Sequence, residues 1–214
     1  MSALIILSGG MDSVTCLHHH KQAGITHALN FDYGSKHNAM EQEKARVNCD
    51  KLGIDFKIIS LDFIGKYFKS DLLKSGDDVP EGHYAEESMK RTVVPFRNAI
   101  MLSIATGYAE SLKLDRVYIA NHAGDHTIYP DCRLDFVKAF GDSMKLGTWA
   151  GVSLIAPYTL LTKRQIAEIG KQIGVDYAET YTCYRGGLKH CGKCGSCTER
   201  KEALFGFDPT QYEA

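Results

Sequence analysis

Neither sign of charge predominates in this chain, which has 25 lysines and arginines against 26 aspartates and glutamates. A protein that binds duplex nucleic acid or tRNA over a wide face usually carries a basic excess. The balance therefore predicts no nucleic-acid partner. The sequence also has no internal repeat and no low-complexity tract, which leaves an ordinary globular protein of 214 residues.

Long hydrophobic runs are missing as well. No stretch approaches the roughly 20 apolar residues that cross a bilayer, and residues 1–7 lack the basic start and the small-residue cleavage site of a signal peptide. We therefore expect a cytoplasmic protein without membrane contact. Because a reducing compartment disfavours structural disulfides, the seven cysteines predict metal ligands or buried thiols.

Apolar segments of strand length alternate with helical segments along most of the chain. The expected strands are residues 3–7, 26–31, 56–60, 116–121 and 153–156, and the expected helices are residues 13–23, 38–52, 97–112, 134–146 and 162–173. This alternation predicts the α/β class, with a mostly parallel, doubly wound sheet that binds ligands at the carboxyl ends of its strands. We expect a nucleotide-binding domain over residues 1–176 and a small C-terminal zinc-binding region over residues 177–214, packed on it.

A polar stretch over residues 65–91 interrupts this alternation and contains Gly76, Pro80 and Gly82. Loops of this length are uncommon in compact domains and often serve as lids or partner surfaces. A disordered excursion is the other interpretation, and the sequence leaves both open.

A glycine-rich turn, Ser8-Gly9-Gly10-Met11-Asp12-Ser13, lies between the first expected strand and the first expected helix. Glycines permit a tight turn, and the free N–H groups at a helix start attract an anion. The turn is neither a Walker A loop nor a G-x-G-x-x-G motif. It is similar to the S-G-G-x-D-S turn of the PP-loop ATP pyrophosphatases, which usually adenylate a carboxylate or carbonyl oxygen. The predicted nucleotide-binding residues are Leu7, Ser8, Gly9, Gly10, Met11, Asp12, Ser13, Val14, Thr15, Cys16, Leu17, Phe31 and Tyr33.

The turn has no Walker lysine, so positive charge for the phosphates must come from elsewhere. Arg97 opens one expected helix, and Lys163 and Arg164 open another. Because basic residues at a helix start oppose the helix dipole, a bound anion would explain them. A solvent-facing cation is the alternative, above all for Arg164. Mg²⁺ is the expected counter-ion of the phosphates, with Asp12 as a candidate ligand.

Four of the seven cysteines, Cys183, Cys191, Cys194 and Cys197, fall within fifteen residues. Four thiolates fill a tetrahedral zinc shell and leave no open position, so we expect one structural Zn²⁺ per chain. An iron–sulfur cluster also takes four cysteines and is the main alternative.

The segment 121–133 follows an expected strand and is dense in polar side chains. Asp125, Asp131 and Arg133 are candidates to bind the donors and acceptors of a heterocycle, while His122 and His126 are candidates to move protons. Each residue alone also fits turn chemistry or helix capping. Their density at a strand end predicts a substrate site.

Four segments together resemble the 7-cyano-7-deazaguanine synthase (QueC) family of the PP-loop superfamily. They are the turn 8–13, Val94-Pro95-Phe96-Arg97-Asn98, Tyr129-Pro130-Asp131-Cys132-Arg133, and Thr182-Cys183-Tyr184 followed by the other three cysteines. The motifs occur in the family's order over almost the whole chain. Met11 and Phe96 stand where many members have Gln and Gly, and the first cysteine gap is one residue shorter than is typical.

This resemblance implies an ATP-dependent ligase, or nitrile synthase, of queuosine precursor biosynthesis. Its substrates would be 7-carboxy-7-deazaguanine, ammonia and ATP, and its product 7-cyano-7-deazaguanine, formed through an activated carboxylate and an amide. The resemblance implies an adenine nucleotide α-hydrolase-like fold and a homodimer. It makes Arg97, Asp131, Arg133 and Lys163 the candidate catalytic residues, with Asp131 and Arg133 orienting the base.

Three other functions stay open on the sequence. A relative of the family would transfer the activated deazaguanine acid to a protein or peptide amine instead of ammonia. A PP-loop tRNA thiolase would hold an iron–sulfur cluster on the same cysteines. A zinc-knuckle protein would bind nucleotide without turnover.

Overall fold

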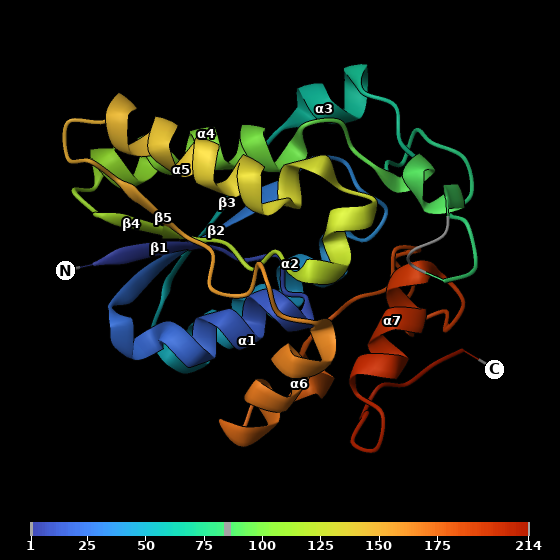
Figure 1. The fold of residues 1–214 in the computed structure, drawn as a ribbon. Helices are drawn as coiled ribbons and strands as arrows, with labels where there is room; N and C mark the ends of the chain where they lie inside the picture. Colours follow the sequence, from blue (N-terminus) through green and yellow to red (C-terminus); the bar gives the residue numbers. More distant parts are fainter. Residues whose placement is uncertain (1, 84–86, 214) are drawn as a thin grey trace.

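The computed structural model describes residues 2–83 and 87–213 and has a parallel sheet at its centre (Figure 1). Its strands lie in the order β3-β2-β1-β4-β5, and every neighbouring pair is parallel. The five strands are β1 (Ala3–Ile6), β2 (Ile25–Asp32), β3 (Asp55–Ser60), β4 (Arg116–Tyr118) and β5 (Ser153–Ile155). This arrangement confirms the predicted α/β class.

Helices cover both faces of the sheet, as Figure 1 shows. One face carries α1 (Met11–His20), α2 (Asn38–Leu52) and α6 (Lys163–Gln172), and the other carries α3 (Asp62–Tyr67), α4 (Arg97–Ser111) and α5 (Leu134–Gly147). The central strand feeds both layers because successive side chains of a strand point to opposite faces. Ile5 packs into the core under α1, and Leu4 packs into the core under α4.

The C-terminal region contains α7 (Gly195–Ala203), which the sequence did not predict. Its Arg200 is fully buried and donates to the carbonyl of Tyr177 and to the hydroxyls of Thr180, Thr182 and Thr210. These bonds hold α7 against residues 177–182, the segment that follows α6. The division of the chain after residue 176 stays a prediction.

The polar stretch 65–91 runs from the end of α3 toward the cysteine region, with residues 84–86 outside the described part. Leu72 and Leu73 are buried in the core under α4, and Val79 packs against the cysteines. The amide of Gly82 donates to the carbonyl of Lys193. The described part of the stretch is therefore packed at these points. Its role as a lid or partner surface stays a prediction.

Some expected element boundaries were wrong. The first helix begins at Met11, two residues before the expected start, because Gly10 serves as its N-cap residue. β4 ends at Tyr118 rather than at residue 121, since the chain leaves the sheet there toward the cavity described below. No helix in the described part of the chain combines the length and apolarity that crossing a membrane requires.

Candidate functional site

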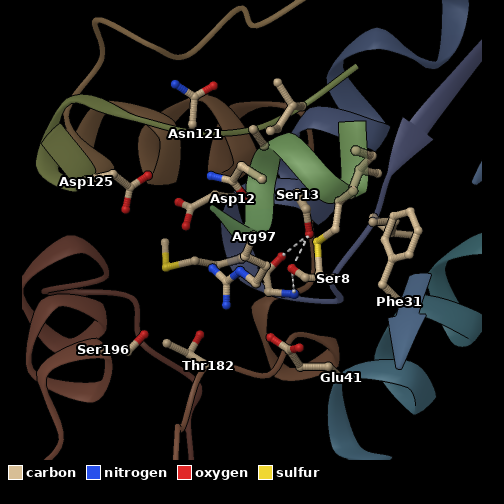
Figure 2. Close-up of a pocket in the computed structure, with 18 of the residues that line it drawn as sticks. Ser8, Asp12, Ser13, Phe31, Glu41, Arg97, Asn121, Asp125, Thr182 and Ser196 are labelled. Atoms are coloured by element: carbon tan, nitrogen blue, oxygen red, sulfur yellow. Dashed lines mark hydrogen bonds between the residues drawn. The ribbon is translucent and has the colours of Figure 1, made fainter. Parts of the chain in front are cut away.

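A cavity opens where the strand order reverses, between β1 and β4. In open parallel sheets this switch point is the usual ligand site. The segments that follow β1, β2 and β4 all contribute side chains to the cavity wall, together with α4, α6 and the cysteine region. Figure 2 shows these side chains pointing into one space. The convergence of the strand ends was expected from the sequence, but the contribution of the cysteine region was not.

The glycine-rich turn forms one end of this cavity. Gly10 caps α1 without a side-chain hydrogen bond, so no described side chain occupies the amides that open the helix. Ser8 Oγ accepts from the amide of Gly10 at 3.1 Å and lies 3.0 Å from Ser13 Oγ, which also donates to the carbonyl of Gly10. These bonds fix both hydroxyls beside the helix start. The arrangement is that of an anion site.

Gly9 is needed for packing rather than for approach to a ligand. Its φ is +91°, and a Cβ there would lie 2.2 Å from the carbonyl oxygen of Glu41 on α2. Any side chain would therefore force α2 away from the turn.

The predicted nucleotide-binding residues divide into two groups. Those that line the cavity are Leu7, Ser8, Gly10, Met11, Asp12, Ser13, Phe31 and Tyr33. Those that do not are Gly9, Val14, Thr15, Cys16 and Leu17. Within the second group, Val14, Cys16 and Leu17 are fully buried in the core, and Thr15 Oγ1 bonds the carbonyl of Met11 and the Tyr177 hydroxyl. A role for this second group in binding nucleotide stays a prediction.

A cluster of charges that we call the acid–lysine cluster (Asp12, His122, Asp125, Lys163 and Glu199) lies beside the turn. Lys163 Nζ is 3.1 Å from Asp12 Oδ2 and 2.8 Å from Glu199 Oε2. Burial acts to lower the pKa of Lys163, but the carboxylates of Asp12, Glu199 and Asp125 outweigh it and raise the pKa above its usual value. The lysine therefore keeps its positive charge at the start of α6. The carboxylates of Asp12 and Glu199 account for a cation at this position without a bound anion.

His122 completes this cluster and is almost fully buried. Its Nδ1 accepts from the amide of Gly124, so in the neutral ring Nε2 carries the proton. Nε2 lies 3.6 Å from Asp125 Oδ1 and 3.9 Å from Asp12 Oδ2. Asp125 in turn accepts from the amide of His122. Of the acidic oxygens here, Asp12 Oδ1 is buried without a hydrogen bond in the described part of the chain.

The opposite end of the cavity is formed by a second group, the Glu41 group (Tyr33, His37, Glu41 and Arg97). Arg97 donates to the Tyr33 hydroxyl at 3.0 Å and lies over its ring. Burial lowers the pKa of His37 to about 4, so this ring is neutral, and burial raises the pKa of Glu41 to about 8. Arg97 was predicted from the sequence. His37 and Glu41 were missed, although their i,i+4 spacing just after β2 is a signal that places both on one helix face at the rim.

Asp131 and Arg133 are not among the residues that line the cavity. Asp131 Oδ2 accepts from the amide of Asn98 in the first turn of α4, and Arg133 is exposed and donates to the carbonyl of His126. Cys132 between them does face the cavity, where its sulfur accepts from Asn98 Nδ2. A role for Asp131 and Arg133 in orienting a base stays a prediction. Arg164 points elsewhere, to Glu168 and to the carbonyls of Ala203 and Phe205.

The four predicted metal ligands converge. The sulfurs of Cys183, Cys191, Cys194 and Cys197 lie within 4.8 Å of one another, and all four side chains are buried. Backbone amides donate to the sulfurs of Cys183 and Cys191. Cys194 caps α7 and Cys197 lies in its first turn, where the helix start favours thiolates.

The spacing of these sulfurs fits a single tetrahedral ion. Zn–S bonds of about 2.3 Å place two sulfurs about 3.8 Å apart, and Cys191 Sγ and Cys197 Sγ are separated by 3.9 Å. In an iron–sulfur cluster the four cysteines bind at least two different iron atoms, so some of their sulfurs lie farther apart than around a single ion. The cluster is therefore compatible with zinc.

The cysteine region also forms part of the cavity wall. Tyr181, Thr182 and Tyr184 line the cavity beside Cys183, and Ser196 lines it between Cys194 and Cys197 (Figure 2). Glu199, two residues after Cys197, is the group that bonds Lys163. Thus α7 joins the four-cysteine cluster directly to the acid–lysine cluster. No sequence pattern indicated this long-range contact.

Comparison with known proteins places this geometry in a family. The family model described as "Queuosine biosynthesis protein QueC" matches residues 2–208. A protein of Porphyromonas gingivalis named 7-cyano-7-deazaguanine synthase is 59% identical, over 99% of this chain and 97% of its own. A protein of the same name from Desulfotalea psychrophila is 49% identical, over 99% of each chain.

The solved structures give a more distant likeness. The NMN synthetase of Francisella tularensis aligns with a TM-score of 0.53 at 17% identity, over 88% of this chain and 69% of that one. At this identity the likeness bears on the fold alone. It agrees with the parallel α/β sheet of this chain.

Proposed function

This chain belongs to the QueC family of queuosine biosynthesis proteins, and we propose that it converts 7-carboxy-7-deazaguanine, ammonia and ATP to 7-cyano-7-deazaguanine. The proposal makes the protein an ATP-dependent enzyme that forms carbon–nitrogen bonds. Near-complete coverage of relatives that carry the synthase name supports it. So does the cavity, which combines an anion-binding turn with a dense set of polar side chains.

The reaction needs two activations. A carboxylate repels nucleophiles and has a poor leaving group, so ATP first converts one oxygen to a phosphoryl or adenylyl ester. Ammonia then displaces that oxygen, which leaves with the phosphate, and an amide forms. In the second activation, a second ATP converts the amide oxygen to a phosphoryl or adenylyl ester. That oxygen then leaves with the phosphate, the amide nitrogen loses both of its protons, and the nitrile forms without a second ammonia.

We assign the phosphate-binding role to the turn 8–13 and the positive charge to Arg97 and Lys163. The uncapped amides of α1 are preorganised donors for the negative charge that develops on the transferring group. Arg97 and Lys163 line the same cavity from different helices. Most of the rate enhancement would then come from positioning and electrostatics.

Mg²⁺ fits the acid–lysine cluster. Asp12 Oδ1 is buried and lacks a hydrogen bond, which is costly unless a ligand completes it. Asp12 would hold the ion, and the ion would neutralise the phosphates of ATP. The four cysteines would hold one structural Zn²⁺, which fixes the wall formed by Thr182 and Ser196. We also propose, from the family resemblance, that the protein is a homodimer.

The observation that carries the proposal is that the open start of α1 and the cysteine region face one cavity. The test is to incubate the zinc-loaded full chain with ATP and the carboxylic acid, with and without ammonia, and to weigh the products. The nitrile, formed only with ammonia, is the expected result. An adduct with an added peptide amine, and none with ammonia, would instead support the transferase function. No consumption of ATP under any condition would overturn both.

Asp12→Asn is the matched variant for this assay. It keeps the size of the side chain but removes the charge for a metal ion, so ATP turnover should fall by about 10²–10³-fold. Asp50→Asn, at an exposed position of α2, serves as the control. Equal activity of the Asp12 and Asp50 variants would remove Asp12 from the site.

A further inference from the structure

Three carboxyl groups line the cavity, and Glu41 alone among them has neither a hydrogen bond nor an ion pair with a lysine or arginine in the described part of the chain. Asp12 pairs with Lys163, and Asp125 accepts from the amide of His122. Glu41 lines the same cavity, and His37 Nε2 lies 3.7 Å from its Oε2. That contact is longer than a hydrogen bond, and the buried His37 ring is neutral. A carboxyl group in such a place needs a partner from outside the chain.

The Glu41 carboxyl group is also largely shielded from water. Its side chain is 17% exposed, and its surroundings raise its pKa to about 8, because burial outweighs the nearby Arg97. Desolvation without a hydrogen bond is unfavourable for an acid. In the empty cavity the group therefore keeps its proton below about pH 8. A ligand that donates two hydrogen bonds would favour the ionised carboxylate, and the proton would leave to solvent as the ligand binds.

The surroundings of Glu41 suit a flat aromatic ring. Tyr33, Tyr129 and Tyr184 line the cavity together with Phe31, and the hydroxyls of Tyr129 and Tyr184 lie 3.4 Å apart. Aromatic walls bind planar bases by stacking. A carboxylate at the edge of such a space can accept two parallel N–H bonds, as it does from a guanidinium group.

The position of Glu41 is fixed with respect to the phosphate turn. Its carbonyl oxygen packs directly against Gly9, and its amide donates to the carbonyl of His37 at 3.1 Å. In Figure 2, Glu41 and Asp12 lie toward different ends of the cavity, with Arg97 between them in this view. A base held by Glu41 would therefore lie within the cavity that also contains the phosphate turn.

We propose that the Glu41 carboxylate recognises the guanine-type edge of the deazapurine substrate by accepting its ring N–H and its exocyclic amino group. This inference rests on the proposed function for the identity of the base. It makes Glu41 a specificity residue, since a base without the amino group leaves one carboxylate oxygen unpaired. The hydroxyl pair of the ATP ribose is another donor pair that a carboxylate can bind, and the experiment separates the two.

The experiment compares Glu41→Gln with Glu43→Gln, an exposed position on the same helix, in the zinc-loaded full chain. Equilibrium binding of 7-carboxy-7-deazaguanine and of its analogue without the 2-amino group is measured in the absence of ATP. The wild type and Glu43→Gln should bind the parent about 10- to 100-fold more tightly than the analogue. Glu41→Gln should lose most of that preference. Circular dichroism and zinc content verify that each variant is folded.

Steady-state kinetics then assign the effect to one substrate. With Glu41→Gln the KM for the deazaguanine acid should rise, while the KM for ATP stays within about twofold of the wild-type value. A rise confined to the KM for ATP would overturn the proposal in favour of the ribose. Equal preference for the 2-amino group in the wild type and Glu41→Gln would overturn it as well.

The binding measurement keeps the two proposals apart. If the wild type binds the acid with the expected preference but makes no nitrile, the proposed reaction fails and the assignment of Glu41 stands. If turnover is normal and the preference does not depend on Glu41, only the assignment fails. If the wild type does not bind the acid, both are overturned.

Discussion

The two ends of the cavity handle charge in opposite ways. In the acid–lysine cluster, Lys163 lies between two carboxylates at 3.1 and 2.8 Å, and His122 faces Asp125. In the Glu41 group, the carboxyl group has no hydrogen bond from the described part of the chain. Apart from Asp12 Oδ1, the charged groups at the first end pair with one another, whereas the Glu41 carboxyl group at the second end has no lysine or arginine partner in the described part of the chain. The difference suggests that the chemistry is preorganised at the first end and that the substrate is selected at the second.

Loss of the metal should have the largest effect, because α7 supports both the cavity wall and the acid–lysine cluster. Cys194→Ser removes one of four thiolates, so we expect loss of zinc, a fall of the melting temperature by more than about 10 °C and loss of turnover. Zinc content and thermal unfolding measure this. Cys49→Ala, a buried thiol outside the cluster, should keep its zinc. A Cys194→Ser protein that melts at the wild-type temperature would contradict a structural metal.

Replacing the cation tests the paired end directly. Lys163→Met leaves Asp12 and Glu199 facing each other without a positive charge, which should cost about 3–5 kcal/mol of stability. Turnover should fall by about 10²–10³-fold, since the phosphates lose a cation. Chemical denaturation and ATP consumption measure the two effects. Lys138→Met, at an exposed site on α5, should change neither. Unchanged stability in Lys163→Met would show that the ion pairs of Lys163 do not stabilise the folded protein.

Glu199 tests whether α7 positions Lys163. Glu199→Gln keeps a hydrogen-bond acceptor but removes a charge, so Lys163 should shift toward Asp12, and kcat should fall by about 10-fold with zinc retained. The matched control is Glu202→Gln, on the same helix but exposed and paired with His83. Metal analysis alongside kcat separates positioning from loss of the metal. Equal kcat values for the two variants would remove Glu199 from the argument.

The pH dependence of stability sharpens the comparison at the Glu41 end. The folded-state pKa of Glu41 is raised to about 8 from 4.5. The contribution of this group to the stability of the folded protein is therefore fully present below pH 4.5 and is lost as pH rises through 8. The side chain introduced by Glu41→Gln cannot lose a proton. The free energy of unfolding of the variant, relative to that of the wild type, should therefore rise by roughly 2–4 kcal/mol over this pH range. Urea unfolding of the ligand-free protein at several pH values measures the difference.

His37 and His190 contribute a pH dependence of stability with the opposite sign. This contribution is the same in both proteins and cancels when their stabilities are compared. Burial lowers the pKa of each to about 4, so their contribution is present above pH 6.5 and is lost as pH falls through 4. Both rings are shared by the wild type and Glu41→Gln. A pH-independent difference between the two proteins would mean that Glu41 is not desolvated in the empty cavity.

The strands and the metal ligands were predictable because their signals are local. Apolar runs such as residues 3–7 and the cysteine spacing both lie within short stretches of sequence. α7 was missed, since Gly195–Ala203 has few apolar residues and its burial depends on Arg200 bonding three distant threonines. Glu199 was missed for the same reason. Its partner Lys163 is 36 residues away, and only the fold brings them together.

Asp131 and Arg133 illustrate the limit of motif reading. Both fall in a segment that carries the family resemblance, yet Asp131 bonds an α4 amide and Arg133 bonds a carbonyl near the surface. The cysteine between them faces the cavity. The motif therefore identified a segment that reaches the cavity wall, but the direction of each side chain depends on the tight turn Pro130–Cys132.

The contact between Gly9 and α2 fixes the distance between the glycine-rich turn and Glu41. A Cβ on Gly9 would lie 2.2 Å from the Glu41 carbonyl oxygen, so the backbone of the glycine-rich turn is in direct contact with the backbone that carries Glu41. If Glu41 holds the base, the reach from ring to phosphorus is set by the fold. An acid with its carboxyl group one methylene farther from the ring would then overshoot, and such a homologue should bind without being consumed.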